Sequence, residues 1–253
     1  MTRSMLLRAG LTAAAASLAV AAGVAAQLKP APPPKPQDWR AGGEGRAYAS
    51  GPARIVRDFV WGQSLDEASG VLRLNVVDNT WHEDPASEDV LNECVARVKV
   101  PSDKAEYYIK FARLQPVGER RPTMGGVLLN HELFGNTDLG GPGMFPRLKA
   151  YVAAWGYANV VKNNKVIARD RPAFAWVGQA PRAENGKWLY EADRNRVTAH
   201  LVVFGSLGGG SRLPETRDGF LHFEWPTAKV IVPGFTFDPA QKGSTGKVAE
   251  ARP

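Results

Sequence analysis

Two histidines and a glutamate in the C-terminal part of the chain are residue types that bind transition metals or transfer protons. His200 lies in "RVTAHLVVFG", and His222 and Glu224 lie in "FLHFEWPTAKV". Both segments alternate between apolar and polar residues, which predicts two strands. These strands can form a hairpin across the loop 205–218.

One register of this hairpin brings the three side chains together. We consider the register in which Phe204 pairs with Asp218. His200 then lies opposite His222, with Glu224 two residues further along on the same face. Opposed residues have Cβ atoms about 5 Å apart, close enough for two imidazoles to bind one ion. The three residues are therefore candidate ligands of a divalent transition metal such as zinc, iron or copper, or a candidate acid–base pair.

The length of the connecting loop leaves this register open. A loop of 14 residues does not fix how two strands pair, and a hairpin is only one possible connection. The alternative is that His200 and His222 lie on a mixed face, where each is satisfied by hydrogen bonds without a functional role.

A second set of candidate residues lies in "NHELFGNTDLGGPGMFPR", residues 130–147. The first residues of this stretch belong to a predicted central strand, "GGVLLNHELFG", which is apolar on both faces. A long glycine-containing loop follows from Gly135. Glycines let a backbone approach a ligand or another part of the same protein closely. The candidate ligand-binding residues here are His131, Glu132, Asn136 and Asp138. The alternatives are a satisfied core histidine and an ordinary structured loop whose Met144 and Phe145 pack into the core.

Two of the seven tryptophans are candidates for stacking against a ligand. Trp176 and Trp188 flank a predicted turn at Asn185. If their rings are exposed, they are platforms for sugar rings, as in carbohydrate-binding sandwiches. If they are buried, they are ordinary core residues, as most aromatic residues of such domains are.

Familiar catalytic motifs are incomplete. Zinc proteases need two histidines one helical turn apart, but Gly135 and Ala86 stand where the second histidine should follow His131 and His82. The residues after Cys94 lack the histidine and methionine of a mononuclear copper site. The chain also has no Gly-x-Ser-x-Gly elbow.

The N-terminus has the layout of an export signal. Arg3 and Arg8 precede an uncharged run of small apolar residues, and "VAA" then favours cleavage before Gln27. No twin arginine precedes the run, which favours the general secretory route. We expect residues 1–26 to be a cleaved signal peptide and the protein to be periplasmic or secreted, with no transmembrane segment in the mature chain. The alternative is an uncleaved anchor.

Charge and cysteine content narrow the class of protein. The mature chain has 30 basic and 25 acidic side chains, and they are scattered rather than clustered. This pattern excludes a typical nucleic-acid binder, which gathers basic charge on one face. Cys94 is the only cysteine, so an internal disulfide is impossible. The alternation around Cys94 favours a buried, inert thiol over an intermolecular disulfide or a reactive site.

The composition divides the mature chain into three parts. We expect a proline-rich flexible linker at 27–51, a folded domain at 52–237 and a disordered tail at 238–253. The domain shows strand periodicity, with tight-turn signals at Asn163–Asn164 and Asn185–Gly186. Ser64 and Ser87 could cap short helices. The predicted fold is all-β: an antiparallel β-sandwich, or a partly closed barrel, of about nine or ten strands with at most short helices.

These features favour an exported binding or accessory module of the cell envelope. Its partner would be an unknown small molecule, a glycan or an envelope protein, and not a nucleic acid. One alternative is a metal-binding protein or metal-dependent enzyme that uses His200, His222 and Glu224. Another is a structural or assembly protein of the envelope, for which the proline spacer is the support.

Overall fold

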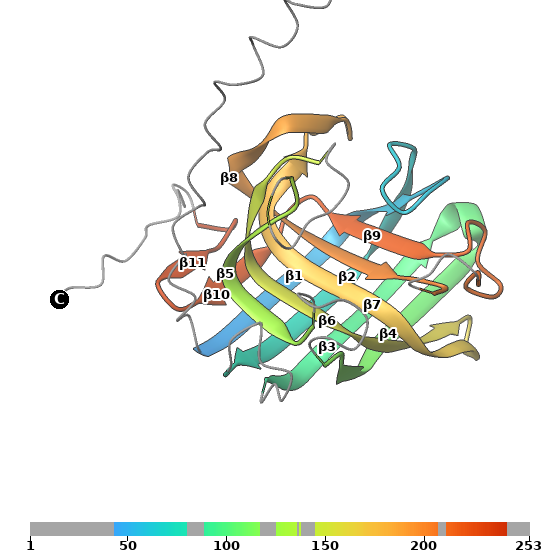
Figure 1. Cartoon of the computed structure of the whole chain (residues 1–253). Helices are drawn as coiled ribbons and strands as arrows, with labels where there is room; N and C mark the ends of the chain where they lie inside the picture. Colours follow the sequence, from blue (N-terminus) through green and yellow to red (C-terminus); the bar gives the residue numbers. More distant parts are fainter. Residues whose placement is uncertain are drawn as a thin grey trace, which may run out of the picture. The chain divides into compact units, whose positions relative to one another are not determined.

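Eleven antiparallel strands form one sheet in the part of the chain that the computed structural model describes (Figure 1). Residues 43–79, 89–116, 125–135, 137, 145–206 and 211–241 are described. The strands are β1 (Gly43–Val56), β2 (Leu65–Asp78), β3 (Val90–Val100), β4 (Ala105–Leu114), β5 (Val127–Leu133), β6 (Leu148–Lys162), β7 (Lys165–Arg182), β8 (Trp188–Val203), β9 (Leu221–Trp225), β10 (Lys229–Val232) and β11 (Phe235–Phe237). Apart from the 3₁₀ turn η1 (Pro101–Asp103), the described residues contain no helix. The all-β prediction is confirmed.

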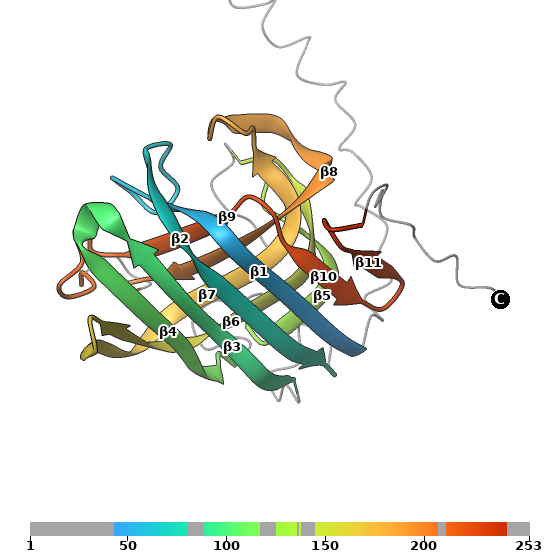
Figure 2. The ribbon, with the colours of Figure 1, turned by 180° about the vertical axis from the view of Figure 1, so that it is seen from behind.

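Eight of these strands make a partial ring. Their order is β1-β2-β3-β4-β6-β7-β8-β9, and β9 returns to pair with β1. The closing contact is short, because only Arg54 and Ile55 of β1 pair with β9. Figure 2, seen from behind, shows β1 to β4 side by side. Of the two architectures expected, the partly closed barrel describes this single sheet better than a sandwich of two sheets.

The ring opens at its other end, because two strands change neighbours along their length. The first half of β1 pairs with β10, and the first half of β6 pairs with β5 instead of β4. The β10–β11 hairpin and β5 therefore extend the sheet beyond the ring. The side-chain amide of Asn130 in β5 donates to the carbonyl of Pro233 at 3.0 Å, which ties these two additions together.

The inside of the ring is filled by side chains, because alternate residues of every strand point inward. Ile55, Leu74, Val98 and Phe223 are among them, and the cluster runs through all eight strands. Gly45 shows how closely the walls approach: a Cβ there would lie 2.5 Å from the Leu129 side chain. The interior is therefore a packed core.

A second, aromatic cluster lies on the outer face of β5 to β8. Its buried members are Leu128, Leu133, Phe134, Phe145, Leu148, Ala150, Ala153, Trp155, Phe174, Trp176 and Val202. The β1–β2 connection packs Val60 and Trp61 against it. The sheet thus has a core on both of its faces along this arc.

Several local predictions are confirmed. Asn163 and Asn164, with φ of 48° and 65°, form the tight turn between β6 and β7. Gly186, with φ of 84°, lies in the turn between β7 and β8. Cys94 is buried, and burial raises the pKa of its thiol. The prediction of an inert thiol thus agrees with its surroundings.

Three local predictions are wrong. Residues 43–51, expected in the flexible linker, belong to β1, because each of them pairs with β2. The segments after Ser64 and Ser87 are strands β2 and β3 rather than short helices, since their alternation buries one face against the core. Leu133 also departs from the alternation of β5: Val127 and Leu129 belong to the interior cluster, whereas Leu133 joins the aromatic cluster. Asn130, with φ of 54°, interrupts the alternation before it.

Two carboxylates protect the outer edge of β5. Asp89 accepts from the backbone N–H of Val127 at 2.7 Å, and Asp78 accepts from that of Leu129 at 3.1 Å. Side chains therefore replace the neighbouring strand that β5 lacks on this side.

A buried arginine holds the closed end of the ring. The guanidinium of Arg57 contacts Asp66 at 2.8 Å, Asp103 at 2.7 Å and Asp218 at 3.0 Å, so it joins β2, η1 and the β8–β9 connection. Burial alone would lower the pKa of Arg57, but the hydrogen bonds to the three carboxylates outweigh it and raise the pKa. The residue is only 2% exposed, so its charge depends on these partners.

Replacing Arg57 with Leu should lower the free energy of unfolding by about 3 to 5 kcal/mol, because it leaves buried carboxylates without a counter-charge. Urea unfolding followed by circular dichroism measures the change. Arg46→Leu is the matched control, since Arg46 pairs with Glu44 in an exposed position, and its unfolding midpoint should stay near that of the parent chain. Equal midpoints for the two variants would contradict the structural role of Arg57.

Candidate functional site

The β1–β2 connection, residues 57–64, lies over the outer face of β7, β8 and β9, and we call it the cap segment. Three consecutive carbonyls of this segment each accept a hydrogen bond from a different strand. Val60 accepts from Nδ1 of His222 at 2.6 Å, Trp61 from Nε1 of Trp188 at 3.2 Å, and Gly62 from Nη2 of Arg182 at 2.6 Å. These bonds place the Trp61 ring against Phe145, Trp176 and His222.

The cap segment needs a glycine at its tightest point. A Cβ on Gly62 would lie 2.3 Å from the carbonyl oxygen of Arg57, well inside contact distance. The backbone N–H of Gly62 also donates to the carbonyl of Phe59 at 2.7 Å. This compact turn is what presents three successive carbonyls to the sheet.

Beneath the cap segment, two histidines form a hydrogen-bond chain whose direction can be derived. The Val60 carbonyl can only accept, so Nδ1 of His222 carries a proton and its Nε2, in the neutral ring, accepts. Nδ1 of His200, 3.2 Å away, must then donate to that Nε2. Nε2 of His200 is left as an acceptor for the Thr198 hydroxyl at 3.1 Å. The chain therefore runs from Thr198 through both imidazoles to Val60.

Both imidazoles are held neutral. Burial lowers the pKa of His222 from 6.5 to about 3, and repulsion from Arg182 adds to this. The pKa of His200 is also lowered well below 6.5, by burial first and then by His222 and Arg182. Trp176 stacks flat on the His200 ring, with centroids 4.1 Å apart, which excludes water from that face. A second proton on His222 would set its Nε2–H against the Nδ1–H of His200.

A buried ion pair lies beside the histidines. Nε of Arg182 is 2.9 Å from Oε2 of Glu224, and both side chains are almost fully buried. Arg182 also donates to the Gly186 and Gly62 carbonyls, and it lies 3.7 Å from the centroid of the Trp188 ring. Burial raises the pKa of Glu224 above 4.5, although the Arg182 charge opposes the rise.

The expected hairpin exists, but its register is wrong by two residues. Val202 pairs with His222, and His200 pairs with Glu224. A shift of two residues keeps every side chain on its predicted face, so the two imidazoles still meet as diagonal neighbours. The prediction failed because the β8–β9 connection is a long folded loop that does not set the pairing.

The metal hypothesis requires His200, His222 and Glu224 to surround one point, and the structure does not place them so. Within the described ranges, no group of three or more His, Cys, Asp or Glu side chains is placed to hold a metal ion. Glu224 faces Arg182 rather than sharing a site with the histidines. His200 and His222 are fully buried, so their hydrogen-bond chain holds the cap segment in place and is not open to a substrate.

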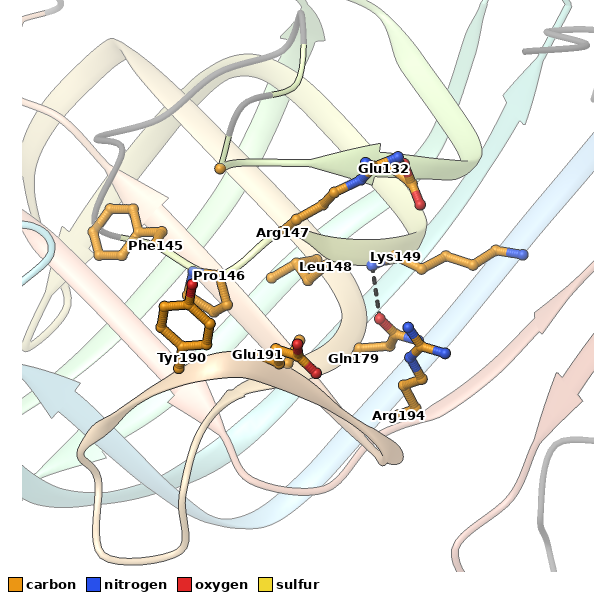
Figure 3. Close-up of a pocket in the computed structure, with 12 residues that line it drawn as sticks. Glu132, Phe145, Pro146, Arg147, Leu148, Lys149, Gln179, Tyr190, Glu191 and Arg194 are labelled. Carbon is orange, nitrogen blue, oxygen red and sulfur yellow. Dashed lines mark hydrogen bonds and ion pairs between the residues drawn. The ribbon is translucent and has the colours of Figure 1, made fainter. Parts of the chain in front are cut away.

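A cavity of about 800 Å³ lies between β5, the start of β6 and the first half of β8 (Figure 3). It exists because β8 departs from β7: the pairing slips between Gln179 and Ala180, where Val197 and then Asp193 are the partners. The lining residues are Glu132, Gly135, Phe145, Pro146, Arg147, Leu148, Lys149, Gln179, Tyr190, Glu191, Ala192 and Arg194. Phe145 and Leu148 also belong to the aromatic cluster, which gives the cavity a packed floor.

Of the predicted ligand-binding residues that the structure describes, one lines this cavity. Glu132 does so, and it forms an ion pair with Arg147. His131 is buried in β5, and Trp176 is fully buried. Trp188 is partly buried against Phe145 and Arg182, so neither tryptophan is an open stacking platform. Asn136 and Asp138 lie outside the described residues.

Neither Arg182 of the buried ion pair nor Tyr190 of the cavity lining was predicted from the sequence as a site residue. Arg182 stands beside a turn in "QAPRAENG" with nothing to mark it as buried, and its ion-pair partner Glu224 is far away in the chain. Tyr190 lies in a predicted strand and looks like any aromatic strand residue. The one available signal was the polar character of residues 191–196, which contrasts with the apolar second half of β8.

No family model matches this chain, and neither the curated proteins nor the solved structures include one with significant similarity to it. The function must therefore be argued from the geometry. No helix in the described residues has the length and hydropathy needed to cross a membrane.

The neutral histidine chain should make stability depend on pH. The unfolded chain protonates both imidazoles near pH 6.5, whereas the native state resists until much lower pH, to about 3 for His222. The free energy of unfolding should therefore be flat above pH 6.5 and fall as pH is lowered from there, by up to about 1.4 kcal/mol per pH unit for each histidine. Glu224, with a raised pKa, contributes a slope of opposite sign that the two histidines exceed.

Urea unfolding at several pH values measures this slope, and ¹⁵N NMR of the imidazoles identifies its source. The signals of His200 and His222 should stay those of neutral rings at pH 5. Titration of either ring near pH 6.5 would show that the chain does not hold them neutral.

The direction of the chain can be tested at Thr198. Thr198→Val should lower the free energy of unfolding by about 1 to 3 kcal/mol, because it leaves the buried Nε2 of His200 without a donor. Thr198→Ser keeps the hydroxyl and should cost clearly less. Urea unfolding at pH 7.5 compares the two variants, and equal stability would mean that the hydroxyl does not donate to His200.

Proposed function

We propose that the mature chain is an exported binding module that holds a small molecule in the cavity beside β8. The observation that carries this proposal is the cavity of about 800 Å³, which lies within the range of roughly 300–1,000 Å³ typical of ligand sites. Its lining combines an apolar floor, Phe145 and Leu148, with charged and amide groups at the rim.

The walls of the cavity are supported from behind. Phe145 contacts Trp188, with centroids 4.4 Å apart, and Trp61 at 5.2 Å. Trp61 is in turn fixed by the cap segment, whose carbonyls are held by three strands. A preformed floor lowers the cost of ordering a site when a ligand binds, which favours a binding function.

The sequence supports export of this module. A signal peptide over residues 1–26 would deliver the chain to the periplasm or the medium, and the proline-rich segment would space the domain from its surroundings. In this proposal the protein meets its ligand outside the cytoplasm and carries no chemistry in the buried histidines.

Blocking the cavity should abolish binding. Glu191 is exposed and lines the cavity, so Glu191→Trp should fill it without disturbing the core. We expect compounds from a small-molecule library to raise the Tm of the parent chain, with about 2.7 kcal/mol of stabilisation at a hundredfold excess over Kd. These shifts should disappear in Glu191→Trp, as measured by differential scanning fluorimetry.

The matched control is Glu67→Trp, the same change at an exposed position of β2 outside the cavity lining. It should keep every shift seen with the parent chain. The proposal fails if no compound changes the Tm of the parent chain, or if both tryptophan variants respond alike.

A further inference from the structure

We infer that the ligand of this cavity is a carbohydrate, with a sugar ring stacked on Tyr190 and its hydroxyls bound by Gln179, Glu191 and Arg194. The inference rests on the proposed function, because it names the ligand class of the same cavity. It follows from one exposed aromatic ring and from the mixed charge of the groups around it.

Tyr190 is the most exposed large hydrophobic residue of the described chain, at 97%. Other aromatic rings near the cavity, such as Phe145 and Trp188, are packed in the aromatic cluster or against it. Tyr190 instead stands on β8 beside Phe145 and Pro146 at the edge of the cavity (Figure 3). A free aromatic face on the lip of a cavity suits the apolar face of a sugar ring, which is flat and carries C–H groups.

The polar groups at the cavity offer both donors and acceptors. Glu191 lies below Leu148 in the view of Figure 3, between Tyr190 and Gln179, and its carboxylate can only accept. Arg194 lies beside Gln179, and its guanidinium can only donate. Gln179 is oriented by the backbone N–H of Lys149, which donates to its Oε1 at 3.0 Å, and this leaves the amide NH₂ to donate.

The arrangement of charge favours a neutral ligand. Glu132 and Arg147 form an ion pair with each other, which removes one charge of each sign. Lys149, Glu191 and Arg194 then remain. The Lys149 side chain runs away from Leu148 and Glu191 (Figure 3), and its Nζ lies 5.9 Å from the centroid of the Tyr151 ring. Glu191 and Arg194 are therefore the charges beside Gln179 and Tyr190, with no hydrogen bond or ion pair to any described residue. A small anion would meet Glu191, and a small cation would meet Arg194. Hydroxyl groups both donate and accept, so a neutral polyhydroxylated ring can satisfy both side chains at once.

The site also differs from a purely apolar pocket. A hydrophobic ligand would cover Glu191, Arg194 and Gln179 without giving them partners, at a cost for each group. A sugar covers the apolar floor and Tyr190 with its C–H face and presents hydroxyls to the rim. Among small ligand classes, it therefore matches the largest number of the groups present.

A panel of neutral oligosaccharides tests the inference on the mature chain. Maltotriose, cellotriose, xylotriose and chitotriose are titrated by isothermal calorimetry, and tryptophan fluorescence is followed in parallel because Phe145 contacts Trp188. Galacturonate and glucosamine serve as an anionic and a cationic probe. Galactose and glucose are titrated as their neutral counterparts. We expect at least one neutral oligosaccharide to bind, and each charged monosaccharide to bind more weakly than its neutral counterpart.

Variants of Tyr190 identify the stacking contribution. Tyr190→Ala should weaken binding of the sugar roughly tenfold, and Tyr190→Phe should stay within about threefold, because it keeps the ring. Tyr48→Ala is the matched control: Tyr48 is 42% exposed on β1 and is not in the lining, so this variant should bind like the parent chain. Glu191→Gln should weaken sugar binding and leave the Tm of the unliganded chain unchanged.

The outcomes separate this inference from the proposed function. Sugar binding that depends on Tyr190 supports both. If no panel sugar binds, but a library compound of another class binds and is lost in Glu191→Trp, the carbohydrate inference is wrong and the binding function stands. If neither sugars nor library compounds bind, both are wrong.

Discussion

The carbonyl of Val60 is the group on which the architecture of the outer face depends. Because it can only accept, it fixes the tautomer of His222. That tautomer fixes the tautomer of His200, which in turn makes the Thr198 hydroxyl a donor. A single backbone orientation thus orders three buried side chains. The neighbouring carbonyls, held by Trp188 and Arg182, keep that backbone in place.

The buried polar chain and the cavity are connected by packing. The cap segment positions Trp61, Trp61 contacts Phe145, and Phe145 lies in the cavity floor. A polar network that is fully satisfied specifies one arrangement of a core, whereas aromatic rings alone can repack in several ways. In this molecule, the histidines help to fix the conformation of the cavity floor and do not themselves line the cavity.

Strand periodicity predicted the all-β fold, the faces of the strands and two tight turns, because these are local properties of the chain. The pairing of His200 with Glu224 was not predictable, since a shift of two residues preserves every face and a long loop sets no register. The extent of β1 was missed because its glycines and alanines resemble a linker, and only the structure shows that the crowded interior leaves no room for a side chain at Gly45. The ion pair of Arg182 with Glu224 and the position of Tyr190 at the cavity depend on residues distant in sequence.

The carboxylates of Asp78 and Asp89 on the edge of β5 bear on whether the protein aggregates in concentrated solution. An open strand edge invites the edge of another molecule, and chains that dock in this way grow into aggregates. Here the two N–H groups at Val127 and Leu129 are already occupied by side chains of the same molecule, and the charge nearby repels a second β5. At high concentration, folded molecules should therefore not associate through the edge of β5.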